Sequence, residues 1–237
     1  MASKTIDIKD LGPVNFSKRR GARNLRVSVT DSGVIRVSFP WWVSYEIARR
    51  FLNSRKDWVL SKRSETSFLF EPGQQIGKSH RLVFKADMIS QIRTRLVGNE
   101  IVVYHPDRLH LDHEKLQIAA TKAVVRALHK ESKTLLNIRL AELARQHGFS
   151  YSKAHFRVLK SRWGSCNTDG KIVLNIFLLQ LPWHLVDYVI VHELAHTKAM
   201  NHSPKFWQLV ESKMPDFKLR RKELKRYRPT FKTQSVA

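Results

Sequence analysis

The first third of the chain alternates hydrophobic and polar residues over short runs, which predicts β-strands. Residues 26–29 and 34–39 follow a period of two, and the turn-forming residues 31–33 between them predict a hairpin. Pro40 is expected to close the second strand, and Ser44 is expected to cap a helix that carries the next apolar positions. The chain is therefore predicted to open with a sheet followed by a helix.

A second group of strands is predicted further along the chain. Three strand-like runs lie at residues 81–84, 92–96 and 101–104. Residues 98–99 are a Gly-Asn pair, which predicts a turn between the last two runs. The strand pattern ends near His105, and we place a boundary there, between a β-rich N-terminal α+β region over residues 1–108 and a second region over residues 109–237. The sequence shows no internal repeat.

Beyond this boundary the hydrophobic period lengthens to three and four. This period predicts helix over residues 114–146, either as one bent helix or as two, with Gly148 as its C-terminal stop. Strand patterns at residues 155–159 and 171–175 then precede a helix over 183–200, and Ser203-Pro204 is expected to begin another. Because strands and helices occupy separate stretches of the chain, we predict the α+β class.

The helix over residues 183–200 contains the run His192-Glu193-Leu194-Ala195-His196, an H-E-x-x-H motif. Four residues make about one helical turn, so the two imidazoles project from the same face and can bind one zinc ion. Glu193 follows the first histidine directly, which places its carboxylate beside the ion, where it can accept a proton from zinc-bound water. The motif therefore predicts a hydrolytic zinc site.

A third histidine, His202, lies six residues after His196. The spacing equals that of H-E-x-x-H-x-x-G-x-x-H, in which the third histidine completes the zinc site, but Ala199 stands where that pattern has glycine. We therefore expect the helix to end near Met200 and Asn201 to turn the chain in a left-handed conformation. Three histidine ligands leave a fourth position for water, which is typical of catalytic zinc.

Two structural alternatives stay open on the motif alone. The first is that His192 and His196 are partly buried histidines of an ordinary helix. The second is a structural zinc site, which does not account for Glu193 and usually has a fourth protein ligand.

The motif stands among other distinctive runs. These are Arg162-Trp163-Gly164-Ser165-Cys166, Ile172-Val173-Leu174-Asn175, and Asn201-His202-Ser203-Pro204-Lys205-Phe206-Trp207. Together with the motif they resemble the YgjP-like metallopeptidase family, whose members are also described as predicted metal-dependent hydrolases. The resemblance is dense from about Phe156 to Phe217 and looser before it. The family is more distantly similar to the SprT-type proteases, which degrade proteins crosslinked to DNA.

The resemblance implies a zincin-like metallopeptidase domain with an active-site helix, preceded by the β-rich N-terminal part. It also implies one Zn²⁺ ion held at the positions of His192, His196 and His202, with Glu193 catalytic. In zincins a strand beside the cleft pairs with an extended peptide. The strands around Trp163 and Asn175 are candidates for this role. The alternative is a tight turn with Trp163 packed in the core.

Other side chains near the motif are candidates for contact with the substrate or the transition state. Arg162 or Ser165 could contact the substrate carbonyl. Tyr188 lies one turn before His192 and could donate a hydrogen bond to the developing oxyanion, or it could be an ordinary packing residue. Cys166, the chain's single cysteine, is better explained as a small buried residue than as a regulatory thiol.

The chain is strongly basic, with a formal net charge of +23. Such a charge attracts polyanions, nucleic acid above all, although a solvated basic surface is an equal alternative. The densest basic segment is C-terminal, where five residues are candidate nucleic-acid contacts: Arg220, Arg221, Lys222, Lys225 and Arg226. No sequence-reading motif accompanies them.

The sequence thus predicts a zinc-dependent hydrolase, a metallopeptidase that acts on a protein or peptide substrate. Two other functions stay open: a non-peptide zinc amidase, and a basic nucleic-acid-associated protein that either degrades DNA-bound proteins or has a latent zinc site. No run reaches the ~18 apolar residues that span a bilayer, so no membrane association is expected. With one cysteine and no signal-like N-terminus, a cytoplasmic location is expected.

Overall fold

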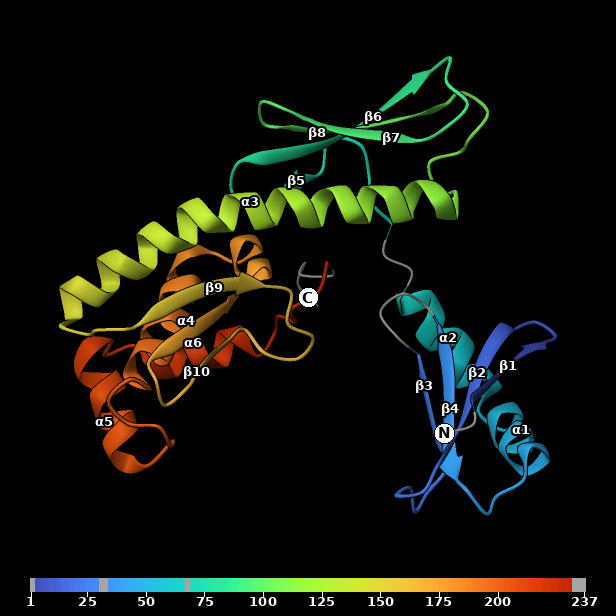
Figure 1. The fold of residues 1–237 in the computed structure, drawn as a ribbon, viewed down its shortest axis with the longest axis horizontal. Helices are drawn as coiled ribbons and strands as arrows, with labels where there is room; N and C mark the ends of the chain where they lie inside the picture. Colours follow the sequence, from blue (N-terminus) through green and yellow to red (C-terminus); the bar gives the residue numbers. More distant parts are fainter. Residues whose placement is uncertain (1–2, 30–33, 67–68, 232–237) are drawn as a thin grey trace. The chain divides into compact units, whose positions relative to one another are not determined.

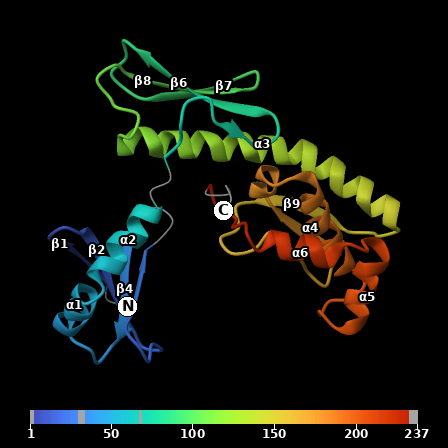
Figure 2. The ribbon, with the colours of Figure 1, turned by 180° about the vertical axis from the view of Figure 1, so that it is seen from behind.

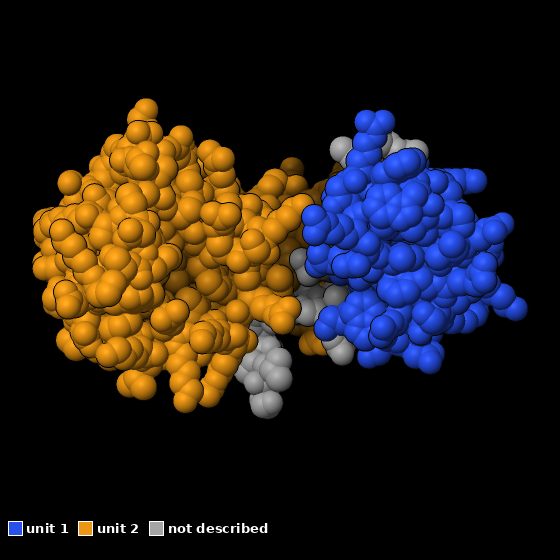
Figure 3. All heavy atoms as spheres, turned by 90° about the horizontal axis from the view of Figure 1, so that it is seen from below, with its two compact units in different colours: residues 1–68 blue, residues 69–237 orange. Residues whose placement is uncertain are grey.

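The computed structural model describes residues 3–29, 34–66 and 69–231 (Figure 1). The chain forms two compact units, residues 1–68 and residues 69–237, which Figure 3 colours separately. We call them unit 1 and unit 2. None of the helices in the described ranges has the length and apolar character that crossing a membrane requires.

Unit 1 is a four-stranded sheet followed by two helices. Its elements are β1 (Ser3–Ile8), β2 (Gly12–Arg19), β3 (Arg26–Val29), β4 (Ile35–Pro40), α1 (Tyr45–Asn53) and α2 (Lys56–Thr66). The strand order is β1-β2-β4-β3, with a parallel pair in the centre and an antiparallel strand at each edge. The predicted hairpin is confirmed as the antiparallel pair β3–β4, while its predicted turn residues 31–33 lie outside the described residues.

The core of unit 1 follows from the period-two pattern. Val14 and Phe16 of β2 are fully buried, as are alternate residues of β4, and Leu52 of α1 packs in the same cluster. Ser44 caps α1 as predicted, because its Oγ accepts a hydrogen bond from the Ile47 amide at 3.3 Å. Unit 1 therefore has its own hydrophobic core.

The first part of unit 2 is another four-stranded sheet. It contains β5 (Gln75–Ile76), β6 (His80–Asp87), β7 (Arg93–Val97) and β8 (Glu100–Pro106). The order is β5-β6-β8-β7, again with a central parallel pair and an antiparallel strand at each edge. The two sheets thus share one topology, and this structural repeat was not detectable as a repeat in the sequence.

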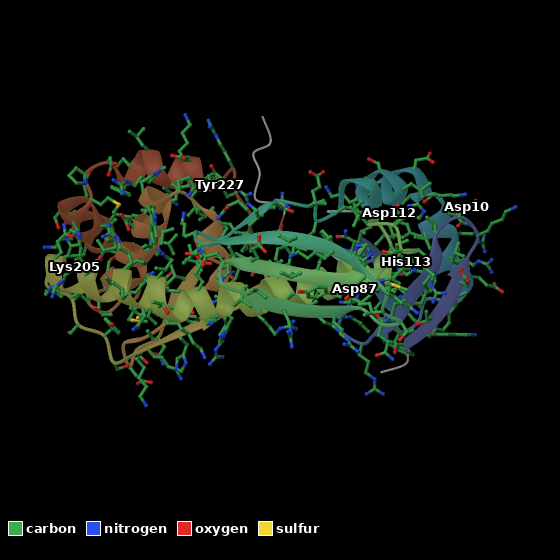
Figure 4. The ribbon with its side chains drawn as sticks, turned by 90° about the horizontal axis from the view of Figure 1, so that it is seen from above. Asp10, Asp87, Asp112, His113, Lys205 and Tyr227 are labelled. Carbon is green, nitrogen blue, oxygen red and sulfur yellow. The ribbon has the colours of Figure 1, made fainter. Side chains whose placement is uncertain are left out.

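The helical pattern after this sheet forms one helix, α3 (Glu114–His147), rather than two. Gly148 ends it in the left-handed conformation at φ 68°, as predicted. Figure 4 shows the N-terminal end of α3, near His113, at the opposite end of unit 2 from Lys205. The helix is long enough to carry the β5–β8 sheet along one part and the remaining elements along another (Figures 1 and 2).

The division between the compact units does not fall at the expected boundary of 108/109. It falls at 68/69, because β7 and β8 pack against α3 and belong to the same unit. Glu131 of α3 adds polar contacts to the same junction. Its carboxylate accepts a hydrogen bond from the Lys78 amide at 2.6 Å and lies 2.8 Å from Nδ1 of His80.

The rest of unit 2 contains a small sheet and the helices that hold the histidine motif. The elements are β9 (Lys153–Arg157), β10 (Gly164–Cys166), β11 (Lys171–Asn175), a 3₁₀ helix η1 (Ile176–Gln180), α4 (Trp183–Ala195), α5 (Pro204–Lys213) and α6 (Phe217–Leu224). The strand order is β10-β11-β9, so β10 lies at an edge of the sheet. The predicted α+β class is confirmed, with a β-rich N-terminal part followed by helices.

Candidate metal centre

The helix α4 is apolar on almost every side and is buried accordingly. It contacts α3, α5, α6, β10 and β11, and eight of its apolar residues are buried. One exception is Asp187, which forms two 2.7 Å hydrogen bonds with Nε and Nη2 of Arg139 on α3. This bidentate pair raises the pKa of Arg139 and fixes α4 against α3. The helix therefore presents its histidines from a rigid support.

The three predicted metal ligands come together in the structure. Ligand atoms of His192, His196 and His202 all lie within 4.8 Å of one another, and the Nε2 atoms of His192 and His202 are 3.1 Å apart. Zinc–nitrogen bonds of about 2.0–2.1 Å place tetrahedral ligand atoms about 3.3 Å apart. The three imidazoles therefore fit a single zinc ion with only small adjustments.

The chain reaches His202 by a different route from the one predicted. The helix ends at Ala195 rather than near Met200, and His196 is already its C-cap residue. The expected left-handed pivot at Asn201 is wrong, because Asp10 is the only non-glycine residue with positive φ in the described ranges. Turns directly after His196 bring the chain back instead. A longer helix would have carried the chain past the site before it could return.

Ala199, which replaces the glycine of the related zinc pattern, takes part in this turn. Its carbonyl oxygen lies 3.0 Å from Nδ1 of His196. Because a carbonyl can only accept, Nδ1 carries the proton and Nε2 keeps its lone pair for a metal. This hydrogen bond is the type of interaction that orients histidine ligands in metalloproteins.

Two aromatic residues of α5 form the floor of the site. Phe206 is fully buried and stacks on His196, with ring centroids 4.4 Å apart, and it meets His192 edge-on at 5.0 Å. Trp207 stacks on His202 at 5.5 Å. The expected N-cap and first-turn pair, Ser203 and Pro204, begins this helix. The packing fixes the ring planes of all three histidines.

Two of the histidines are held in the neutral form that metal binding requires. Burial, together with the charges of His196, His202 and Arg221, lowers the pKa of His192 to about 3. Burial also lowers the pKa of His196, against the effect of its hydrogen bond to Ala199. Both imidazoles therefore offer a free lone pair at neutral pH without having to lose a proton.

The side chain of Glu193, which projects from α4, packs against Gly164 of the edge strand β10. This side chain is buried, and a Cβ atom added to Gly164 would be 2.7 Å from both Cγ and Oε1 of Glu193. The glycine of the Trp163-Gly164-Ser165 run is therefore required by the carboxylate that packs on it. Burial raises the pKa of Glu193 to about 8 in the absence of a metal, while the charge of Arg162 acts in the opposite direction.

Asn175 is buried and fully hydrogen-bonded, so its predicted contact with substrate is wrong. Its side chain is fully buried, and its amide group donates to the carbonyl oxygens of Leu159 and Arg162 at 2.8 and 2.9 Å. Its Oδ1 accepts from the Phe177 amide at 3.2 Å. With both ends of the amide occupied, Asn175 holds the loop that leads into β10 and cannot reach a substrate.

The other candidate residues of this loop are accessible. Arg162 is exposed, and Trp163, Ser165 and Cys166 are half-buried. The alternative that Trp163 packs in the core of a tight turn is therefore wrong. Burial and the charge of Glu193 raise the pKa of the Cys166 thiol to about 11. A thiol with this pKa is protonated at neutral pH, which argues against a reactive regulatory cysteine.

The basic C-terminal residues do not form one free surface. Arg220 donates to Asp216 at 2.8 Å and to the carbonyl oxygen of His184 at 3.0 Å. Arg221 lies over the ring of Trp207, 4.5 Å from its centroid. Lys222, Lys225 and Arg226 are exposed. Two of the five candidate nucleic-acid contacts are thus engaged within unit 2.

Arg221, which the sequence suggested only as a nucleic-acid contact, lies close enough to the histidines to affect them. Its charge lowers the pKa of His192 and opposes the burial that raises the pKa of Tyr188. Tyr188 is itself buried, with its ring 6.0 Å from that of His192. No sequence pattern connects Arg221 with the motif, because only the packing of α6 against α4 brings it there.

A family profile and two solved structures are similar to this chain. The family profile described as "YgjP-like, metallopeptidase domain" matches residues 23–227. Among solved structures, the metallopeptidase zymogen abylysin of Pyrococcus abyssi is 27% identical with a TM-score of 0.35, over 38% of this chain and 91% of that one. The zymogen jannalysin of Methanocaldococcus jannaschii is 20% identical with a TM-score of 0.31, over 37% and 93%. No curated protein matches.

Proposed function

This chain belongs to the YgjP-like metallopeptidase family, and we propose that it is a zinc peptidase that uses Glu193 as its general base. In this proposal His192, His196 and His202 hold one Zn²⁺ ion. The observation that carries it is the convergence of three imidazoles, together with a buried carboxylate that directly follows His192 in the chain and is not part of the cluster. A structural zinc site has no use for that carboxylate.

The chemistry follows from the roles that these side chains can take. The zinc ion would supply a Lewis acid that acidifies a water molecule and polarises the substrate carbonyl. Glu193 accepts the proton of the attacking water and passes it to the leaving amine. The buried position of Glu193 shields the proton from exchange with bulk water between the two steps.

Substrate binding is assigned to the edge strand β10. One side of β10 pairs with β11, and the strand has no second partner among the described strands. An extended peptide can add to such an edge through its main chain. Ser165 lies on this strand and Arg162 just before it, and both are accessible to the substrate. Tyr188 and Arg221 supply a hydrogen-bond donor and a positive charge near His192, which suits a developing oxyanion.

The central test is the substitution Glu193→Gln. The amide keeps the shape of the side chain but cannot act as a base, so we expect kcat on a peptide substrate to fall about 100- to 10,000-fold. The protein should retain one zinc ion per chain, measured by metal analysis after gel filtration. Peptide cleavage at an unchanged rate would refute the role of Glu193, and loss of zinc would show that Glu193 supports the metal instead.

A second variant tests the same role through geometry. In Gly164→Ala the added methyl group would take the space of the Glu193 carboxylate. A displacement of about 1 Å can cost about 100-fold in rate, so we expect a loss of that order with zinc retained. Gly21→Ala in unit 1 is the matched control, because a Cβ there meets nothing within 4 Å. Equal activity of the two variants would contradict the proposed position of Glu193.

A further inference from the structure

Unit 1 contains a basic cavity that the peptidase chemistry does not use. Its volume is about 1100 Å³. The lining includes five basic residues and one aromatic: Lys18, Arg19, Arg20, Arg23, Arg26 and Trp41. The lining contains no acidic residue, and the sequence has no Asp or Glu from residue 11 to residue 30. The cavity therefore carries a strong positive potential.

The topology of the first sheet creates this concentration of charge. Because β2 and β4 are parallel, their C-terminal ends lie at the same edge of the sheet, and Arg19 is paired with Pro40 (Figure 1). The chain leaves β2 at Arg20 and leaves β4 at Trp41, so these two residues emerge side by side. The antiparallel partner β3 begins at Arg26, opposite Ser38 of β4. Residues from three strands thus meet around one opening.

The cationic side chains are available to bind an anion. In the described part of the chain no carboxylate forms an ion pair with any of the five basic residues. Lys18 lies over the ring of Tyr45, 5.2 Å from its centroid, which holds the lysine at the cavity without neutralising it. Five unpaired charges in one place destabilise a small unit, so a bound polyanion would offset their mutual repulsion.

The aromatic residue of the cavity indicates the kind of polyanion. Trp41 is 58% exposed, and Trp42, which follows it outside the lining, is 60% exposed, although a tryptophan side chain is usually largely buried. The two rings meet edge-to-face, with centroids 5.9 Å apart and an interplanar angle of 87°. Flat rings that are accessible to solvent beside cationic side chains are the combination that binds unpaired bases and their phosphates.

We propose that unit 1 binds single-stranded nucleic acid in this cavity. The arginines and Lys18 contact phosphates, and a base stacks on Trp41. A duplex would keep its bases stacked internally and leave Trp41 without a role, whereas a single strand offers a phosphate and an unpaired base at every nucleotide. We expect binding to be largely independent of base sequence, because phosphate contacts and stacking on an aromatic ring do not depend on the identity of the base. The proposal does not rest on the peptidase activity of unit 2.

The test uses the full-length, zinc-loaded protein and a fluorescein-labelled twelve-nucleotide oligothymidylate. We expect binding in fluorescence anisotropy at about 50 mM salt, with an affinity that falls steeply as salt is added. Trp41→Ala should weaken binding about tenfold. Trp58→Ala is the matched control, because Trp58 is 47% exposed on α2 of the same unit but lies outside the cavity lining. It should leave the affinity unchanged.

A second pair of variants tests the role of the charges. The double substitution Arg20→Gln/Arg23→Gln should weaken binding and reduce the slope of log K against log salt by about 1.4, since each phosphate contact contributes about 0.7. Arg49→Gln/Arg50→Gln removes the same charge from exposed positions on α1 and should change the slope by less than half as much. Glu193→Gln should bind the oligonucleotide like the wild type, which separates this site from the peptidase site.

Several results would overturn the proposal. These are the absence of binding at low salt, equal losses in the cavity variants and their matched controls, and tighter binding of a twelve-base-pair duplex than of the single strand. Binding of thymidine monophosphate as tight as that of the oligonucleotide would indicate a nucleotide site instead. Because Trp41, Arg20 and Arg23 are exposed, their substitution should not unfold unit 1, and circular dichroism of each variant checks this.

Discussion

The two four-stranded sheets have the same strand order and pairing directions but different surroundings. In unit 1 the sheet packs with Leu52 and other residues of its own unit into a separate core. In unit 2 the sheet packs on α3. There the buried carboxylate of Glu131 forms hydrogen bonds with the backbone amide of Lys78 and the imidazole of His80. Gly77 makes this approach possible, because a Cβ there would be 2.5 Å from Oε2 of Glu131.

The difference shows how one topology can serve two purposes. The second sheet is joined to α3, which is joined to α4 through the Arg139–Asp187 pair, so it is part of the structure that supports the metal ligands. The helices described in unit 1, α1 and α2, have only 9 and 11 residues, whereas α3 has 34. The end of the first sheet where β2 and β4 finish instead carries the basic residues of the cavity and the exposed Trp41 and Trp42. We therefore expect the two sheets to respond differently to the same kind of perturbation.

The largest expected effect comes from matched leucine substitutions in the two units. Leu52 and Leu128 are both helical and fully buried, so Leu52→Ala and Leu128→Ala should each destabilise their own unit by about 3–5 kcal/mol. Leu128→Ala should also weaken zinc retention and lower peptidase activity on warming, because α3 supports α4. Leu52→Ala should leave both unchanged. Scanning calorimetry with a zinc titration measures this, and parallel loss of zinc in both variants would show that the distinction is false.

Removal of the metal should give a somewhat smaller effect, confined to unit 2. Zinc that binds only the folded site stabilises it by about 2.7 kcal/mol when its concentration is 100 times Kd. Chelation with EDTA should therefore lower the thermal transition of unit 2 and not that of unit 1. The Leu52→Ala variant helps to separate the two transitions. A shift of both transitions on chelation would contradict the independent cores.

The smallest effect concerns the chain's single cysteine, which makes a specific reporter of unit 2. With a pKa of about 11, about one Cys166 thiol in a thousand is ionised at pH 8, so native labelling by a thiol reagent should be slow. The rate should rise about tenfold per pH unit below pH 11. Leu128→Ala should accelerate labelling through local opening, and Leu52→Ala should not. Rapid labelling of the wild type at pH 7 would contradict the raised pKa.

Much of the fold was determined by local sequence patterns. The period-two runs located the hairpin β3–β4, the change of period located α3, and Ser44 and Gly148 marked helix ends, because caps and amphipathic faces depend on neighbouring residues. The shared topology of the two sheets was not visible, since strand order depends on contacts between distant segments that no local pattern records. The unit boundary at 68/69 was not predicted for the same reason, because β7 and β8 continue the strand-rich part of the sequence but pack on α3.

The sequence by itself also selected the three histidines that the fold brings together, because metal ligands need particular atoms at particular spacings. Tertiary structure alone decided how they are supported. It ended α4 at Ala195, used the Ala199 carbonyl to orient His196, occupied Asn175 with the preceding loop, and brought Arg221 and Gly164 to the site. These features depend on the close packing of segments far apart in the chain, where one atom more or less decides whether a group fits.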